Sequence, residues 1–168
     1  MPTVVDKPDF LKPIIRRKVL SARNDGTLAT RVDFGGAGQL TFDEPSAHGG
    51  TDLGPTPLTG VLASLCGCEA VTFGRTAREM EFSYEGLDFD AAFTIDIRGR
   101  SGMRGVVPHF QTVKVEVRVR TAESEASLAE VVEETEARCP VYNLIKDAGV
   151  RIEMIWIRDT SGVAAVVA

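Results

Sequence analysis

The sequence predicts an α+β fold with largely antiparallel sheets around a buried central helix. The first observation behind this prediction is a strong hairpin signal near the N-terminus, and the second is one long, mostly apolar helical segment in the middle of the chain. The third is that helices and strands occur in groups and do not alternate one by one. The predicted order is three strands, a long helix, two strands, two helices and a final strand.

The first three strands are predicted on either side of turn-forming residues. Residues 14–36 contain two strands around Asn24, Asp25 and Gly26, because Asn and Gly tolerate positive φ. A third short strand is predicted at 39–45, after the glycine-rich turn at 35–38.

The central helix is predicted from Pro57 to about Met80. Thr56 is a suitable N-cap, and proline is favoured at the first helical position because its missing N–H needs no partner there. The first sixteen residues of the helix are apolar on almost every side, which indicates a buried helix with other structure all around it.

Two longer strands and another helix follow. The segments 87–99 and 112–120 carry apolar residues at alternate positions, and the second segment has one polar face. Ser127 and Glu130 are spaced as a capping box for the next helix. Glu133, Glu134 and Glu136 are expected on the solvated face of that helix.

A proline divides the C-terminal helical region into two. Cys139 precedes Pro140 and is therefore disfavoured in helical dihedrals, so the first helix should end at Arg138. Pro140 can begin a short helix that runs to Asp147, and the final strand is predicted at 151–157.

Length and composition predict one domain without a basic surface. Within the 168 residues we expect a single domain at 14–158, with an N-terminal arm at 1–13 and a short C-terminal tail at 159–168. The net charge is -5, whereas proteins that bind nucleic acid or an anionic membrane typically carry a basic surface. Neither is therefore expected as a partner. No apolar run resembles a secretory signal or an uninterrupted membrane span, so the expected location is cytoplasmic.

Three cysteines in a reducing compartment are expected to be buried, metal-bound or reactive. Cys66 and Cys68 point about 200° apart on a helix, so they cannot chelate one metal or easily form a disulfide with each other. A zinc site that combines one of them with Cys139 and either His48 or His109 is an alternative that no ligand spacing supports.

The surroundings of the three cysteines differ. Cys66 shares an apolar face with Glu69, whose charge opposes a thiolate, so Cys66 is expected to be a small core residue. Cys68 has more polar neighbours, although helix geometry alone favours a structural role for it too. Cys139 would be the N-cap of the helix that begins at Pro140, where the helix dipole favours a thiolate. A helix break that happens to contain a cysteine explains the same residues equally well.

Two segments together resemble the OsmC/Ohr family, the osmotically inducible and organic hydroperoxide resistance proteins. They are GGTDLGPTPLTGVLASLCGCEAVTF, in which a Gly/Pro loop opens the central helix, and CPVYNLIKDAGVRIEMIW, in which a cysteine precedes a proline. The resemblance extends from about Leu20 to Trp156. The first family cysteine, eleven residues after the loop proline, falls on Cys68, and the second falls on Cys139. Glu69 departs from the family pattern, and Cys66 is extra.

The resemblance implies an OsmC-like fold and a thiol-dependent peroxidase that works without flavin, haem, metal or another cofactor. Cys68 would be the peroxidatic thiol that reduces an organic hydroperoxide or hydrogen peroxide and becomes a sulfenic acid. Cys139 would be the resolving thiol that condenses with it to a disulfide, which an external dithiol then reduces. The resemblance also implies an intertwined homodimer with its sites at the subunit interface.

A peroxidase of this kind requires a cation near Cys68, because a thiol with a pKa of about 8.5 is only about 3% ionised at pH 7. The arginine and the glutamate that family peroxidases carry around the loop proline are both absent, and His48 stands at the position of the arginine. The candidate replacements are Arg23, Arg31, Arg75 and a protonated His48.

Two other functions remain as alternatives. The absent arginine and glutamate favour a non-catalytic or weakly active OsmC-like module that binds a small molecule or senses redox state. A hydrolase has His48 and His109 available, but the sequence contains no G-x-S-x-G turn to present a nucleophile.

Overall fold

The computed structural model describes residues 11–161. The chain forms two compact units, which are adjacent in sequence between Thr56 and Pro57. Both units contribute to the span predicted as one domain, 14–158. The predicted arm at 1–13 and the predicted tail at 159–168 lie mostly outside the described residues.

The first unit contains an antiparallel sheet in the order β1 (Ser21–Asn24), β2 (Thr30–Asp33) and β3 (Gln39–Phe42). The predicted hairpin and third strand are confirmed, although the first strand is shorter than expected. Asn24 closes the hairpin turn, because its Nδ2 donates to the carbonyl oxygens of Thr27 and Ala29, both at 2.8 Å. Gly26 supplies the positive φ, +91°, that the turn requires.

Asp43 shapes the glycine-rich loop that follows β3. Its Oδ2 accepts hydrogen bonds from Thr51 N at 2.9 Å, Thr51 Oγ1 at 2.6 Å and Leu53 N at 3.2 Å. The hydrogen bond from the Thr51 side chain is the main reason why the pKa of Asp43 is lowered to about 2. The loop also needs its glycine at position 50, because a Cβ there would collide with the carbonyl group of Glu44.

The second unit is built on a sheet in the order β4 (Gly86–Ile95), β5 (Phe110–Arg120) and β6 (Arg151–Asp159). β4 and β5 are antiparallel, in keeping with the predicted antiparallel character. β6 runs parallel to β5, because the helices α3 (Glu125–Arg138) and α4 (Pro140–Asp147) carry the chain back to the end where β5 began. The second sheet is therefore mixed.

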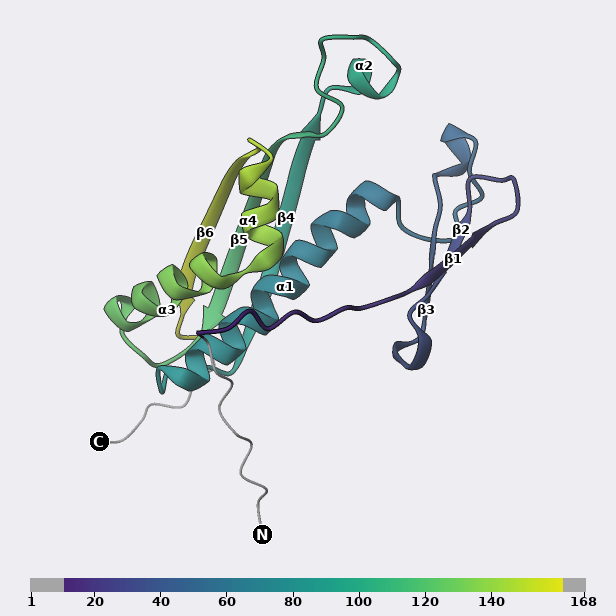
Figure 1. Ribbon diagram of the computed structural model, residues 1–168. Helices are drawn as coiled ribbons and strands as arrows, with labels where there is room; N and C mark the ends of the chain where they lie inside the picture. Colours follow the sequence, from purple (N-terminus) through teal and green to yellow (C-terminus); the bar gives the residue numbers. More distant parts are fainter. Residues whose placement is uncertain (1–10, 162–168) are drawn as a thin grey trace. The chain divides into compact units, whose positions relative to one another are not determined.

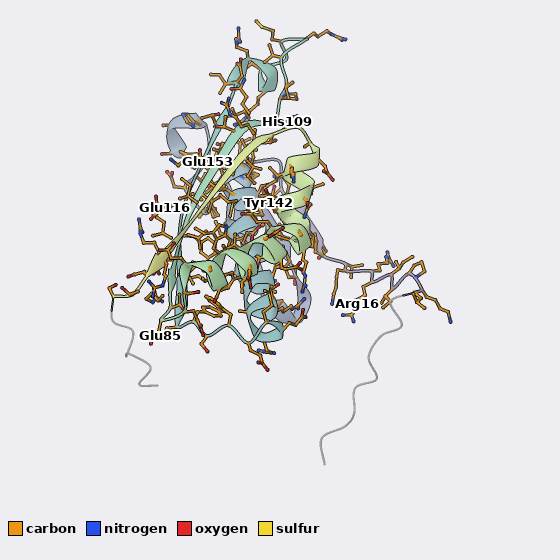
Figure 2. All side chains as sticks on the ribbon, turned by 90° about the vertical axis from the view of Figure 1, so that its left-hand side faces the viewer. Arg16, Glu85, His109, Glu116, Tyr142 and Glu153 are labelled. Carbon is orange, nitrogen blue, oxygen red and sulfur yellow. The ribbon has the colours of Figure 1, made fainter. Side chains whose placement is uncertain are left out.

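The longer helices of the second unit cover one face of this sheet (Figure 1). The four valines at alternate positions of β5 from 113 to 119 are at most 1% exposed and pack in the core with apolar residues of the helices, as their period predicts. The outer face is charged, and there Arg118 forms ion pairs with Asp90 and Glu116. Figure 2 shows Glu116 and Glu153 on this outer side, away from Tyr142 of α4.

α1 (Pro57–Glu79) is the long predicted helix, and this chain covers one of its faces. Its buried residues form a stripe with helical spacing: Leu62, Leu65, Glu69, Phe73, Thr76 and Ala77. Val61 and Val71 are 44% and 56% exposed. A single chain thus covers only one side of the helix, whereas the sequence predicts other structure on every side of it. By length and composition α1 is apolar enough to cross a membrane, a test that the core helices of soluble proteins also pass.

The N-terminus of α3 differs from its prediction. The N-cap is Ser124, whose Oγ accepts a hydrogen bond from Ser127 N at 3.0 Å. The predicted capping box of Ser127 and Glu130 is therefore wrong, because the helix begins almost one turn earlier. The predicted end of α3 at Arg138 is confirmed.

One further short helix, α2 (Ile97–Arg100), interrupts the segment predicted as the end of a strand. Asp96 caps it by accepting a hydrogen bond from Arg98 N at 3.0 Å. This local cap competes with continued strand pairing and ends β4 at Ile95.

Candidate active site

The break between α3 and α4 places Cys139 in the interior. Cys139 ends α3 and is the N-cap of α4, with an extended ψ of 113° that the following proline favours. Asn143 holds the break together, because its Nδ2 donates to the carbonyl oxygens of Glu136 and Cys139, both at 2.9 Å. Cys139 is 0% exposed.

The thiol of Cys139 meets two neighbouring residues of α1. Its side chain interacts with the side chains of Cys68 and Glu69, and both interactions raise the pKa of Cys139. All three cysteines of the chain are free thiols, so the pair of Cys68 and Cys139 is reduced. The structure thus brings together the two cysteines that the family resemblance paired.

Burial raises the pKa of Cys139 to about 12. The backbone N–H of Tyr142 lowers this pKa, which is the predicted effect of a helix N-terminus, but it does not form a full capping hydrogen bond. The interactions with Cys68 and Glu69 keep the proton on Cys139 and raise the pKa further. Burial therefore outweighs the helix dipole, and Cys139 is a neutral thiol at neutral pH.

Glu69 is a buried carboxyl group beside the thiol pair. It is 0% exposed, and in the described part of the chain neither carboxyl oxygen has a partner with full hydrogen-bond geometry. The pKa of Glu69 is raised to about 7. Burial is the main cause, the Cys139 thiol opposes it, and the charge of Glu136 adds to it. On the sequence alone Glu69 is a departure from the family pattern and a charge beside Cys66, with no role assigned to it at the thiol pair. The available signal was an acidic residue on the buried stripe of an apolar helix.

Glu136 packs toward this site and not on the solvated face predicted for it. Its Oε1 accepts a hydrogen bond of 3.0 Å from Trp156 Nε1, and its carboxyl group also interacts with the hydroxyl of Tyr142. Burial and the charge of Glu136 raise the pKa of Tyr142. Glu133 and Glu134 are exposed, as expected. Helical spacing did not reveal the difference, because the partner of Glu136 lies on a distant strand.

Cys66 lies on the other flank of the buried stripe of α1 and packs against the hydrophobic core. Burial raises the pKa of its thiol, and the charge of Glu69 adds to this effect, as the sequence predicts. Because Cys66 and Cys68 point about 200° apart, only one of them can face the break between α3 and α4. That residue is Cys68.

The four candidate cations are all exposed. Arg23 and Arg31 are cross-strand partners in β1 and β2, and His48 ends the short 3₁₀-helix Ser46–His48. These three residues belong to the first unit. Arg75 follows Cys68 by seven residues on α1, which is about 10 Å along the helix axis. Of the four, Arg75 is the one that shares a unit with Cys68.

Within residues 11–161 no group of three or more His, Cys, Asp or Glu side chains is placed to hold a metal ion. His109, one of the two histidines of the zinc alternative, has its Nδ1 at 2.8 Å from the backbone oxygen of its neighbour Phe110. The described side chains therefore offer the zinc alternative no site.

The fold and these side chains define a two-thiol α+β protein, in which the central helix presents one cysteine to a second cysteine at a helix break. More particularly, the chain belongs to the OsmC-like protein family, whose sequence model matches residues 49–155. No curated protein sequence matches the chain.

Solved structures share this fold at low sequence identity. The OsmC like protein from Mycoplasma pneumoniae is 17% identical with a TM-score of 0.73, over 86% of this chain and 99% of that chain. An organic hydroperoxide resistance protein OsmC from Legionella pneumophila is 15% identical with a TM-score of 0.60, over 86% and 99%. The organic hydroperoxide resistance protein OhrB of Bacillus subtilis is 16% identical with a TM-score of 0.59, over 84% and 98%.

Proposed function

We propose that the protein is a thiol-dependent peroxidase that reduces an organic hydroperoxide or hydrogen peroxide through a Cys68 sulfenic acid and a Cys68–Cys139 disulfide. The observation that carries this proposal is the side-chain interaction between these two thiols, which come from distant parts of the sequence. Similar folds in two organic hydroperoxide resistance proteins support the same class of substrate.

In the first step the Cys68 thiolate attacks one oxygen of the hydroperoxide. The O–O bond breaks, the sulfur is oxidised to a sulfenic acid, and the other oxygen takes up a proton and leaves as an alcohol or water. In the second step Cys139 attacks the sulfenic sulfur, the S–O bond breaks, and a disulfide and water form. An external dithiol then reduces the disulfide by thiol exchange.

The burial of the two cysteines suits these different roles. Cys68 is partly exposed, so a peroxide from solvent can approach it. Cys139 is fully buried and neutral, so it does not compete for peroxide before Cys68 is oxidised.

Turnover at neutral pH also requires a positive charge that favours the Cys68 thiolate. We propose that Arg23, Arg31, Arg75 or a protonated His48 supplies it. Each arginine can be replaced with glutamine, and His48 with asparagine, in separate variants. Sulfenic acid formation should become about tenfold slower or more in the variant that lacks the activating cation. If none of the four variants is slower, the cation lies elsewhere.

We further propose that two copies of the chain associate through the exposed face of α1. The helix is apolar on almost every side, yet a single chain leaves Val61 and Val71 about half exposed, at 44% and 56%. A second copy would remove this apolar surface from water.

A coupled assay tests the peroxidase. Wild-type protein should consume tert-butyl or cumene hydroperoxide over many cycles when a dithiol is present. The Cys68→Ser and Cys139→Ser variants should lose this turnover, whereas Cys66→Ser should keep it. Loss of turnover in Cys66→Ser alone would reverse the assignment of the thiols.

A non-catalytic or weakly active binding or sensing module is the second candidate. The observation that favours it is the absence of the loop arginine and glutamate that the resemblance led us to expect. Such a module would form at most one disulfide per chain and stop, even with excess dithiol. A peroxidase would consume peroxide far beyond the amount of protein.

A further inference from the structure

We propose that Glu69 is the proton acceptor that activates Cys139 for disulfide formation, a proposal that rests on the peroxidase function above. Glu69 follows Cys68 in α1, and its carboxyl group interacts with the thiol of Cys139. The carboxyl group is thus a neighbour of the thiol whose proton must leave before the sulfur of Cys139 can attack.

The burial of Cys139 calls for an internal base. Cys139 and Glu69 are both 0% exposed, so neither side chain is in contact with bulk water. A thiol with a pKa of about 12 is ionised in only about one molecule in 100,000 at pH 7. Spontaneous ionisation therefore supplies almost no nucleophile.

The carboxyl group of Glu69 is available for this task. In the described part of the chain its oxygens have no partner with full hydrogen-bond geometry, so their lone pairs are free to accept a proton. Its pKa of about 7 keeps a large share of the group ionised at neutral pH, and a general base works best with a pKa near the working pH.

The titratable groups around Glu69 come from each helix that packs there: Cys66 and Cys68 from α1, Glu136 from α3, Cys139 from the break and Tyr142 from α4. Among the described residues, burial, Cys139 and Glu136 shift the pKa of Glu69, and none of these is a cation. The site therefore favours proton uptake by Glu69.

The resolving step conserves atoms and charge. The Glu69 carboxylate takes the proton from the Cys139 sulfur, and the resulting thiolate attacks the sulfenic sulfur of Cys68. The S–S bond forms as the S–O bond breaks, and the leaving hydroxide takes the proton back from Glu69 and departs as water. Glu69 ends the step as the carboxylate with which it began.

The Glu69→Gln variant tests this role, because the amide has nearly the same shape but cannot take up the proton. Cys68 should still be oxidised by peroxide at the wild-type rate, as measured by trapping the sulfenic acid with a dione reagent. Disulfide formation should be slower by about a hundredfold or more, the usual loss for a general base. Sulfenic acid should therefore accumulate in the variant.

The pH profile separates a proton acceptor from a structural role. In wild-type protein the rate of disulfide formation should rise as Glu69 ionises around pH 7 and then level off. The Glu69→Gln variant should lack this step and should respond only to direct ionisation of Cys139 at high pH. The control is Glu133→Gln, which removes a solvated carboxylate of α3 and should leave both rates unchanged. Wild-type rate and profile in Glu69→Gln would overturn the proposal.

A second measurement does not depend on peroxide. In a Cys66→Ser background, Cys68 is converted to a mixed disulfide with a coloured aromatic thiol, and attack by Cys139 releases the dye. Slow release in the Glu69→Gln variant supports the proton acceptor, and equal release with and without the substitution overturns it. Absence of sulfenic acid in the wild type would instead count against the peroxidase itself.

Discussion

The indole Nε1 of Trp156 donates a hydrogen bond of 3.0 Å to Oε1 of Glu136. This bond joins β6 to α3, close to the break that carries Cys139. The Trp156 ring also stacks on Phe73 of α1, with ring centroids 5.3 Å apart and planes at 16°. One side chain thus joins β6 to α3 and to α1, the helix that carries Cys68.

Trp156→Phe should lower the free energy of unfolding by about 1 to 3 kcal/mol, because it keeps a ring in the core but removes the donor to Glu136. Urea denaturation followed by circular dichroism measures the change. The matched control is Glu136→Ala, which removes the acceptor, alone and combined with Trp156→Phe. Purely additive effects of the two substitutions would show that the hydrogen bond contributes nothing of its own.

Two buried threonines should respond in opposite ways to replacement by valine. Thr76 is 1% exposed and its Oγ1 has no partner in the described part of the chain, so Thr76→Val should raise the free energy of unfolding by about 1 kcal/mol. Thr135 is equally buried, but its Oγ1 donates to the carbonyl oxygen of Val131 at 2.7 Å. Thr135→Val should therefore leave the stability unchanged or lower it. Equal losses in urea denaturation would mean that the Thr76 hydroxyl has a partner.

Glu69 should make the protein less stable as the pH rises through the neutral range. An unfolded glutamate titrates near pH 4.3, and burial raises the pKa of Glu69 to about 7 in the folded protein. The folded state therefore binds more protons between these values, so the free energy of unfolding falls from about pH 4.3 to about pH 7 and then levels off. Urea denaturation at several pH values should show this slope in the wild type and a flatter one in Glu69→Gln. The same slope in both would assign it to other groups.

Asp43 should have the opposite pH dependence. Its pKa falls to about 2 in the folded protein, mainly through the Thr51 side chain, so its contribution is complete above about pH 4 and is lost as the pH falls to about 2. Asp43→Asn removes acceptors from the loop and should speed amide hydrogen exchange at Thr51 and Leu53. Amides of β4 and β5, in the other unit, serve as the internal control and should not change. Unchanged exchange at Thr51 would contradict the role of Asp43.

Val71→Glu should convert the proposed homodimer to a monomer, because it would place a charge in an apolar interface. Light scattering should give twice the mass of one chain for the wild type and the mass of one chain for the variant. The control Ala129→Glu adds the same charge to an exposed position of α3 and should remain a dimer. A wild-type protein that is monomeric at all concentrations would end the dimer proposal.

The elements of the second unit could be predicted well because their signals are local. Alternating valines predict β5, and the Cys139–Pro140 pair predicts the break between α3 and α4. The cap of α3 was misplaced because Ser124 and Ser127 compete for one N-terminus, and only the hydrogen bond from Ser127 N identifies the cap. The parallel pairing of β6 has no local signal either, since it depends on where two helices return the chain.

The sequence by itself determined the order of the elements, the opposite directions of Cys66 and Cys68 on one helix, and the family likeness that paired Cys68 with Cys139. Only the tertiary structure decided which flank of α1 faces the helix break, that a buried carboxyl group lies against the second thiol, and that Glu136 turns inward to Trp156. The physical reason is that periodicity and proline act within a few residues, whereas these contacts join segments that are far apart in the chain and depend on how the helices pack.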